Sequence, residues 1–234
     1  MTGLLLFVVI VIGYLLGSIP FGLFIGKLFA KKDVREVGSG KIGMTNVMRT
    51  AGKKAAAISL ILDILKGSAA VAVAALIFRN DKDMVGIFTP LESAKVLAAM
   101  AALAGHVWPV WLKFKGGRGV ATFFGGLAAL YWPGAFIGGL CVLGLGFRTK
   151  YMSLGSIIGA VIAFILIMAL NILRVDIGFL RVPYPPFEYV VFAMVGAVFI
   201  YIMHRDNIMR LFNGTERKIG DKKKDAAPDA GNPE

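Results

Sequence analysis

Uncharged apolar runs, separated by short basic stretches, dominate the pattern along this chain. Six segments stand out: residues 3–26, 55–78, 96–112, 120–147, 152–173 and 182–203. The first holds 24 consecutive residues without a charge, and the fourth holds 28. About 20 apolar helical residues, at ~1.5 Å each, cross the hydrocarbon core of a bilayer. The pattern predicts an all-α, polytopic membrane helical bundle, and it excludes a soluble enzyme, a disordered chain and a water-filled β-barrel.

The fourth apolar run is interrupted in its middle. It contains Trp132-Pro133-Gly134, and proline cannot continue the hydrogen-bond ladder of a helix. Two short helices in place of one raise the count to about seven spans, and a re-entrant pair is the alternative. With the N-terminus outside and the C-terminus inside, 20 of the 26 Lys and Arg residues lie in the cytoplasm. This N-out, C-in orientation is the one that the positive-inside rule favours.

Composition adds limits on the chemistry and on the domains. The formal net charge is +12, and the single cysteine, Cys141, sits inside an apolar run where nothing would make it reactive. The only two histidines are almost a hundred residues apart, so a dedicated zinc site is not expected. The N-terminal run has no preceding basic residue and is interpreted as a retained anchor. We expect a membrane domain over residues 1–213 and a disordered cytoplasmic tail over 214–234, where no apolar period remains.

The first polar cluster is a glycine-rich, cationic loop. It reads Gly38-Ser39-Gly40-Lys41-Ile42-Gly43-Met44-Thr45-Asn46, with Arg49 three residues further on. Its glycines permit turns that aim backbone N–H groups at an anion, and its hydroxyl and amide side chains add donors. The letters G-x-G-x-x-G occur here, but no strand or βαβ unit surrounds them, so a dinucleotide site is rejected. The alternative is a flexible loop whose charges only set topology.

The second cluster joins a histidine to a basic glycine pair. It begins at Gly105-His106 and ends at Lys115-Gly116-Gly117-Arg118-Gly119, directly before the helix expected from Val120. A helix N-terminus offers unpaired N–H groups and a partial positive charge, so this is a second candidate phosphate site. Interfacial anchoring by tryptophan and lysine is the alternative, and His106 is either a hydrogen-bonded interior residue or a proton shuttle.

The third cluster closes the last apolar segment. His204 and Asn207 are spaced i,i+3 and therefore share a helix face, with Arg210 beyond them. An ordinary polar helix end is the alternative. Asp63 and Lys66, also at i,i+3, lie inside the second apolar segment, where an unpaired charge costs ~2.5–3.5 kcal/mol on insertion scales. We expect them to form a structural ion pair or to line a polar cavity.

These parts favour one class of chemistry. The G-x-S-x-G and H-E-x-x-H motifs are absent, and neither histidine is followed five residues later by an aspartate. Two cationic, glycine-rich anion sites on an apolar bundle suit the joining of a phosphorylated soluble molecule to an activated lipid. A transporter of organic phosphates is the alternative, although it would need polar residues along a path through the bilayer.

Three long motifs occur in order along the chain. They are Ser39-Gly40-Lys41-Ile42-Gly43-Met44-Thr45-Asn46-x-x-Arg49-x-x-Gly52, then Gly105-His106-x-x-Pro109 with Lys115-Gly116-Gly117-Arg118-Gly119-Val120-Ala121-Thr122, and His204-Arg205-x-Asn207-Ile208-x-Arg210-Leu211. Together they resemble the PlsY-type membrane glycerol-3-phosphate acyltransferases. The resemblance covers the chain from about Tyr14 to Glu216. Three positions depart from the family pattern: Lys41 replaces a usual Asn, Arg118 a usual Lys, and Met203 a frequent Arg.

The resemblance implies an enzyme of phospholipid synthesis in the bacterial inner membrane, with its active site facing the cytoplasm. It implies acyl transfer from acyl phosphate to the sn-1 hydroxyl of glycerol 3-phosphate, giving lysophosphatidic acid and phosphate. We expect no metal, cofactor, coenzyme A, covalent acyl-enzyme or nucleic-acid partner; transfer from acyl-CoA by the same fold is the alternative. Ser39, Thr45, His204 and Asn207 are the expected catalytic residues, and Asp63, Lys66 and His106 are supporting polar residues. The expected phosphate-binding residues are Gly40, Lys41, Gly43, Asn46, Arg49, Lys115, Gly116, Gly117, Arg118 and Gly119.

Overall fold

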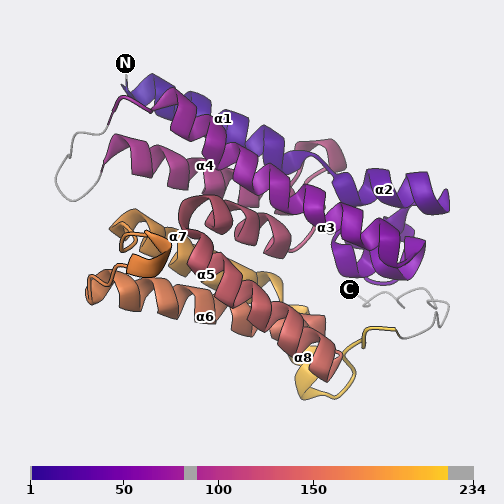
Figure 1. Cartoon of the computed structure of the whole chain (residues 1–234). Helices are drawn as coiled ribbons and strands as arrows, with labels where there is room; N and C mark the ends of the chain where they lie inside the picture. The colour runs from indigo at the N-terminus through magenta and orange to yellow at the C-terminus, as the bar shows by residue number, and fades with distance from the viewer. Residues whose placement is uncertain (1, 82–88, 221–234) are drawn as a thin grey trace, which may run out of the picture.

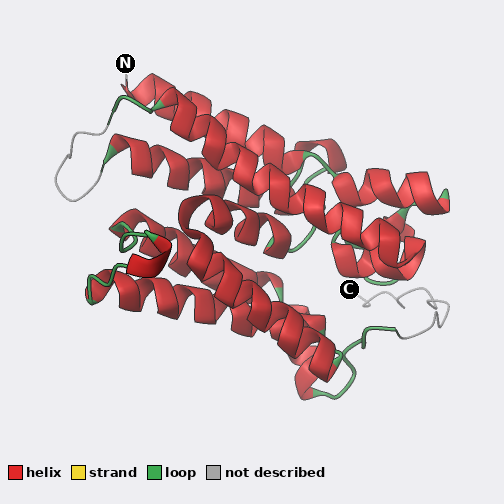
Figure 2. Ribbon diagram, viewed as in Figure 1, coloured by secondary structure: helices red, strands yellow, loops and turns green. Residues whose placement is uncertain are grey.

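The computed structural model describes residues 2–81 and 89–220, and within these ranges the chain is helical with no strand (Figure 2). The α-helices are α1 (Thr2–Ser18), α2 (Phe21–Ala30), α3 (Met44–Ile77), α4 (Pro90–Val107), α5 (Val120–Thr149), α6 (Met152–Ile172), α7 (Phe187–Met203) and α8 (Arg205–Phe212). Three short 3-10 helices are η1 (Val34–Glu36), η2 (Val110–Leu112) and η3 (Gly178–Leu180). The prediction of an all-α membrane bundle is confirmed.

The number of spans depends on how the bent helices are counted. By length and composition, five helical segments of the described chain can cross a membrane, and they include α1 and α2 taken together. A sixth is added if α7 and α8, which are bent by 58° at their junction, count as one span. Seven spans and the N-out, C-in orientation stay a prediction.

Helix α5 breaks in its middle. Tyr131 has non-helical backbone angles (φ −148°, ψ 86°) two residues before Pro133. The chain folds back there, because a Cβ placed on Gly138 would lie 2.8 Å from a ring carbon of Phe124. A straight helix would separate these two residues by roughly 21 Å at 1.5 Å per residue. The run therefore forms the two short helices predicted from its proline, packed against each other (Figure 1).

The two halves of α5 connect two groups of helices. Helices α1, α3 and α4 pack together on one side, and α6 and α7 lie on the other (Figure 1). Close approach depends on small residues, as is usual between membrane helices. A Cβ on Gly105 of α4 would lie 2.2 Å from the Tyr14 carbonyl oxygen of α1. Large apolar side chains such as Leu4 (68% exposed) and Leu76 (69% exposed) cover the outside, as a lipid-facing surface requires.

The segment after α8 is ordered further than expected. Residues 214–220 pack against the bundle: the Ile219 amide donates to the Lys150 carbonyl at 2.8 Å, and Glu216 is buried. A carboxylate and an apolar side chain of this segment thus find partners on the bundle, and the boundary expected at residue 213 stays a prediction. The rest of the predicted tail, residues 221–234, lies outside the described residues.

Candidate active site

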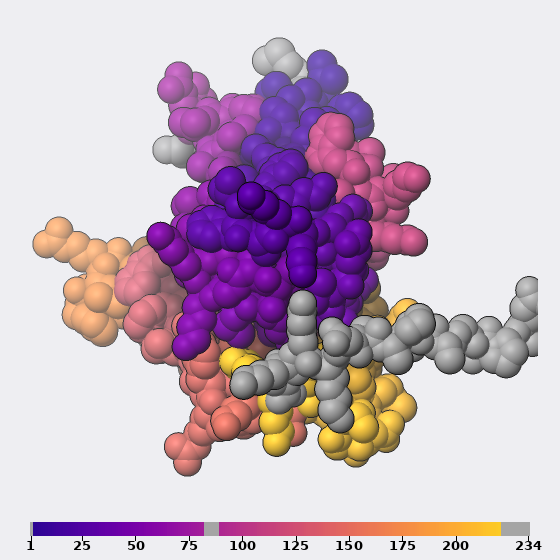
Figure 3. All heavy atoms as spheres, turned by 90° about the vertical axis from the view of Figure 1, so that its right-hand side faces the viewer, coloured from indigo at the N-terminus to yellow at the C-terminus, as the bar shows by residue number. Residues whose placement is uncertain are grey.

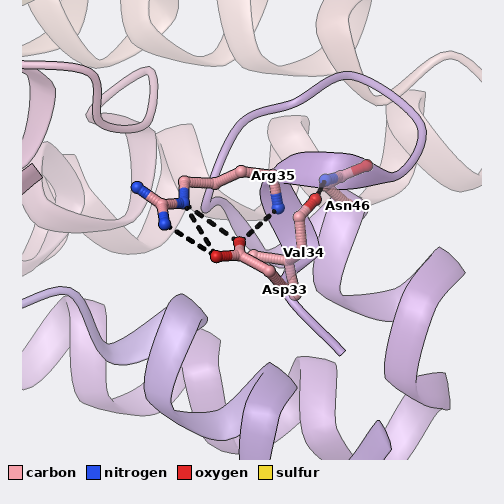
Figure 4. A network of polar contacts seen from close by, with 4 residues as sticks. All are labelled: Asp33, Val34, Arg35 and Asn46. Carbon is pink, nitrogen blue, oxygen red and sulfur yellow. Dashed lines mark hydrogen bonds and ion pairs between the residues drawn. The ribbon is translucent and has the colours of Figure 1, made fainter. Parts of the chain in front are cut away.

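The first loop is organised by the side chain of Asn46. Its amide nitrogen donates to the carbonyls of Val34, Val37 and Lys41 at 2.6, 2.9 and 2.9 Å, and its oxygen accepts from the Ser39 amide at 3.0 Å. Figure 4 shows the bond to Val34, next to the Asp33–Arg35 ion pair of η1. The side chain of Asn46 therefore holds the loop closed, and its expected phosphate-binding role stays a prediction.

The loop leads into a helix start that is available to a ligand. Gly43 precedes α3 without a side-chain cap, and the amide of Asn46 donates to the Gly43 carbonyl at 2.9 Å. The amides of Met44 and Thr45 therefore lie at the end of the loop with no internal acceptor. Gly38 has a φ of 65°, and a Cβ there would meet the Asn46 side chain at 2.4 Å, so only glycine fits. Gly52 interrupts α3 with a φ of 85°, which separates the short helix carrying Thr45 and Arg49 from the long one.

The glycine pair of the second loop caps α4. The amide of Gly116 donates to the Val107 carbonyl at 3.0 Å, and that of Gly117 to the His106 carbonyl at 3.1 Å. These are carbonyls of the last turn of α4, which has no internal donors left for them. In this structure the two glycine amides are thus used within the protein, and the expected phosphate-binding role of Gly116 and Gly117 stays a prediction.

The two cations that flank this pair differ in placement. Lys115 is exposed and does not line the cavity described below, whereas half-buried Arg118 does. Burial lowers the pKa of the Arg118 guanidinium, and the nearby charge of Arg210 lowers it further. An anion bound beside Arg118 would offset both effects. Gly119, next to it, precedes α5 without a side-chain cap, so a second helix N-terminus points its first amides here.

The end of the chain supplies the third part of the site. His204 and Asn207 are both buried, at 3% and 4% exposure. The Nδ1 atom of His204 lies 2.8 Å from the Ile200 carbonyl oxygen. A carbonyl only accepts, so Nδ1 carries the hydrogen and Nε2 of the neutral ring is left as an acceptor. The Asn207 amide nitrogen donates to Glu216 at 2.6 Å, and its oxygen is buried without a protein partner among the described residues.

Glu216 was missed by the sequence analysis as a site residue. Its carboxylate accepts from Ser153 at 2.9 Å, from Asn207 at 2.6 Å and from Arg210 at 2.8 Å. It therefore ties the segment after α8 to α6 and fixes Asn207. The family resemblance, which extends to Glu216, was the one signal that set this acid apart from the other charges of the tail.

One cavity of about 220 Å³ collects most of the expected residues. All three loops meet at one end of the bundle, where the first loop lies beside residues 204–220 (Figure 3). Twelve of the predicted residues line it: Ser39, Lys41, Gly43, Thr45, Asn46, Arg49, Asp63, His106, Arg118, Gly119, His204 and Asn207. Five do not: Gly40, Lys66, Lys115, Gly116 and Gly117.

The cavity also has an apolar part. Helices α3, α5 and α6 contribute aliphatic and aromatic side chains to its wall: Leu60, Ile64, Phe124, Val142, Leu143 and Met152. The cationic loops and the apolar wall therefore belong to a single space that can hold an anionic group and a hydrocarbon chain together. Among the described residues, no cluster of three or more His, Cys, Asp or Glu side chains could hold a metal ion.

Comparison with known proteins identifies the family. A family model described as glycerol-3-phosphate acyltransferase matches residues 7–214. The chain belongs to this family. The glycerol-3-phosphate acyltransferase 3 of Dehalococcoides mccartyi (strain CBDB1) is 47% identical over 93% of this chain and 97% of its own length. The glycerol-3-phosphate acyltransferase of Rhodopseudomonas palustris (strain BisB5) is 43% identical over 92% of this chain and 96% of its own length.

Solved structures of glycerol-3-phosphate acyltransferases agree in fold. The crystal structure of PlsY, an integral membrane glycerol 3-phosphate acyltransferase, in its glycerol 3-phosphate form has a TM-score of 0.76 and 34% identity, and covers 92% of this chain and 96% of that one. The crystal structure of the lysophosphatidic acid form has a TM-score of 0.74 and 33% identity, and it covers 91% of this chain and 94% of that one. The chain is thus an integral membrane acyltransferase of glycerol 3-phosphate and acts in phospholipid synthesis, which decides against the transporter alternative.

Proposed function

We propose that this acyltransferase takes its acyl group from acyl phosphate and places it on the sn-1 hydroxyl of glycerol 3-phosphate, giving lysophosphatidic acid and inorganic phosphate. The observation that carries the proposal is the union, in one cavity, of two uncapped helix N-termini, four arginines including Arg49 and Arg118, and an apolar wall. The similarity to PlsY, crystallised in forms with glycerol 3-phosphate and lysophosphatidic acid, supports this acceptor and this product.

Two phosphate groups need two sets of donors. In our proposal, Arg49 and the first amides of α3 hold one phosphate, and Arg118 with the first amides of α5 holds the other. Helix N-termini bind phosphate through unpaired N–H groups and the helix dipole. Arginine adds bidentate, charge-assisted hydrogen bonds. Lys41, on the rim of the cavity, adds positive charge that attracts both substrates.

The remaining polar residues orient the reacting atoms. The acceptor hydroxyl oxygen attacks the acyl carbonyl carbon and forms the ester bond, while the carbon–oxygen bond to phosphate breaks and phosphate leaves with the electron pair. The hydroxyl proton passes to a phosphate oxygen, or to His204 Nε2, which is the acceptor face of that ring. The buried Asn207 oxygen accepts a hydrogen bond from the acceptor substrate. Ser39 and Thr45 donate to the acyl carbonyl and to the phosphates.

The charge distribution supports a cytoplasmic active site in the bacterial inner membrane. The cavity lies at the end of the bundle that carries the basic loops, which the positive-inside rule assigns to the cytoplasm. Lys41→Cys in a Cys141→Ala background tests this orientation. We expect an impermeant maleimide to label position 41 in inverted membrane vesicles and to leave it unlabelled in intact cells; the reverse pattern would place the site outside.

The donor is tested with purified protein in detergent. Glycerol 3-phosphate is supplied with palmitoyl phosphate or with palmitoyl-CoA, and lysophosphatidate, free phosphate and the acylated position are measured. We expect product with the acyl phosphate and one phosphate released per ester formed. Robust product with the thioester and none with the acyl phosphate would overturn the donor assignment.

The phosphate roles are tested in the same assay. Arg49→Ala and Arg118→Ala should each lower turnover by about 100-fold, which is typical for the loss of a charge-stabilising donor. Lys115→Ala is the matched control, because Lys115 belongs to the same loop as Arg118 but is exposed and outside the cavity. Equal effects of Arg118→Ala and Lys115→Ala would show that the loop acts only through its overall charge.

A further inference from the structure

A buried ionic cluster lies at the wall of the cavity. Asp63, Lys66 and His106 are each 2–3% exposed. Lys66 Nζ lies 2.7 Å from Asp63 Oδ1 and donates to the Ile19 carbonyl at 3.0 Å. The ion pair expected from the i,i+3 spacing is therefore confirmed. Because charged groups are costly inside a membrane protein, a cluster that touches a cavity calls for a functional explanation.

The carboxylate of this pair also faces His106. Asp63 Oδ1 lies 3.5 Å from His106 Nδ1, and both side chains reach the cavity wall while Lys66 does not. Asp63 therefore sits between a lysine that fixes it to the junction of α1 and α2 and a histidine at the end of α4. This contact is an electrostatic one and not a hydrogen bond, and the negative charge favours the ring orientation that turns Nδ1–H toward the acid.

The other side of the His106 ring contacts the second loop. A Cβ on Gly117 would lie 2.0 Å from His106 Nε2, so the ring fits directly against the backbone of Gly117. The Gly117 amide donates to the His106 carbonyl as well, which fixes the same residue twice. Arg118 is the next residue in the chain, and its side chain enters the cavity. The His106 ring therefore packs between Asp63 and the residue that precedes Arg118.

We propose that Asp63 and His106 are positioning residues that set the location of Arg118, with Asp63 acting through the His106 ring and Lys66 holding Asp63. The inference rests on the proposed phosphate role of Arg118. A displacement of about 1 Å in a group that binds the reacting phosphate can cost about 100-fold in rate. The cluster therefore acts on substrate affinity and turnover, and not only on stability.

The chain offers a matched control for a purely structural ion pair. Glu92 and Lys95 on α4 have the same i,i+3 spacing and a contact of 2.6 Å, but they do not line the cavity. Glu92→Gln therefore removes an acid from a pair of the same spacing, although a less buried one, without reaching Arg118. A role confined to stability predicts similar kinetics for Glu92→Gln and Asp63→Asn.

The test is a double-mutant cycle between Asp63→Asn and Arg118→Gln, measured as kcat/KM for glycerol 3-phosphate with whichever donor gives product. We expect Asp63→Asn alone to lower kcat/KM by about 10- to 100-fold and to have less than about a threefold further effect in the Arg118→Gln background, because coupled residues are not additive. Glu92→Gln should change neither background by more than about twofold.

Three results would overturn the inference. The first is that Asp63→Asn changes kcat/KM as little as Glu92→Gln does. The second is that the fold-losses in kcat/KM from Asp63→Asn and Arg118→Gln multiply in the double variant, as they would for independent residues. If Asp63→Asn fails to fold, His106→Asn and His106→Ala carry the test: the asparagine, which keeps a donor toward Asp63, should retain at least about tenfold more activity. The third overturning result is equal activity of His106→Asn and His106→Ala. An Arg118→Gln variant with wild-type kinetics would instead refute the phosphate role itself.

Discussion

Replacement of Glu216 by alanine should lower the free energy of unfolding strongly, although Glu216 lies in the segment after the last helix. The change removes the acceptor of three hydrogen bonds, two of them from the buried donors Ser153 and Asn207. Each bond to a charged group contributes about 1.5–3 kcal/mol. The contact to Arg210, whose side chain is 30% exposed, adds little after solvent screening. Because water enters the vacated space, we take the lower limit for each buried bond, about 3 kcal/mol in all.

This loss can be measured by thermal unfolding. For a chain of this size, 1 kcal/mol corresponds to roughly 2–4 °C, so Glu216→Ala should lower the Tm by about 6–12 °C. The assay follows the helical circular dichroism signal of purified protein in detergent. The control is Asp206→Asn, because Asp206 is 66% exposed and 3.6 Å from an exposed Arg205. A Glu216→Ala melting curve that coincides with the Asp206→Asn curve would refute the proposed anchoring of the segment after α8.

Three further predictions concern the loop, the apolar wall and the helix contacts. Asn46→Ala should raise KM for glycerol 3-phosphate by about tenfold and speed trypsin cleavage of the first loop, because three backbone carbonyls lose their donor. The control Thr50→Ala removes a hydrogen bond within α3 and should change neither the KM nor the cleavage rate. Gly139→Leu should shift the preferred donor from palmitoyl toward decanoyl phosphate in competition assays. A Cβ there meets nothing within 4 Å, the added carbons fill the apolar part of the cavity, and each displaced methylene costs ~0.8 kcal/mol. Gly105→Ala should lower the free energy of unfolding by about 1–3 kcal/mol, since its Cβ would meet the backbone of α1, whereas Gly144→Ala, which faces open space, should be neutral or slightly stabilising in the same melts.

The features that were predictable from sequence are those with local causes. Pro133 removes a helical donor wherever it occurs, so the break in α5 follows from the residue itself, although the distorted angles fall at Tyr131. Asp63 and Lys66 are neighbours on any α-helix, so their pairing also needed no tertiary information. The meeting of three loops at one end followed from the charge pattern along the apolar segments.

The features that were missed depend on contacts between distant parts of the chain. Lys115 and Arg118 carry the same charge, and only the bonds from Gly116 and Gly117 to the end of α4 decide which of them enters the cavity. Asn46 has the donors expected of a ligand-binding amide, but three backbone carbonyls of its own loop use them. Glu216 gains its role from Ser153, 63 residues earlier, and local composition contains no trace of that contact.

The position of residues 214–220 has a practical consequence for handling the protein. Glu216, Arg217 and Ile219 form part of the cavity wall, whereas the start of α1 lies at the opposite end of the bundle (Figure 1). An affinity tag or fluorescent fusion joined directly after residue 220 would begin beside this cavity. The same addition at the N-terminus would be separated from it by the length of α1, so N-terminal fusions are the better choice for kinetic work.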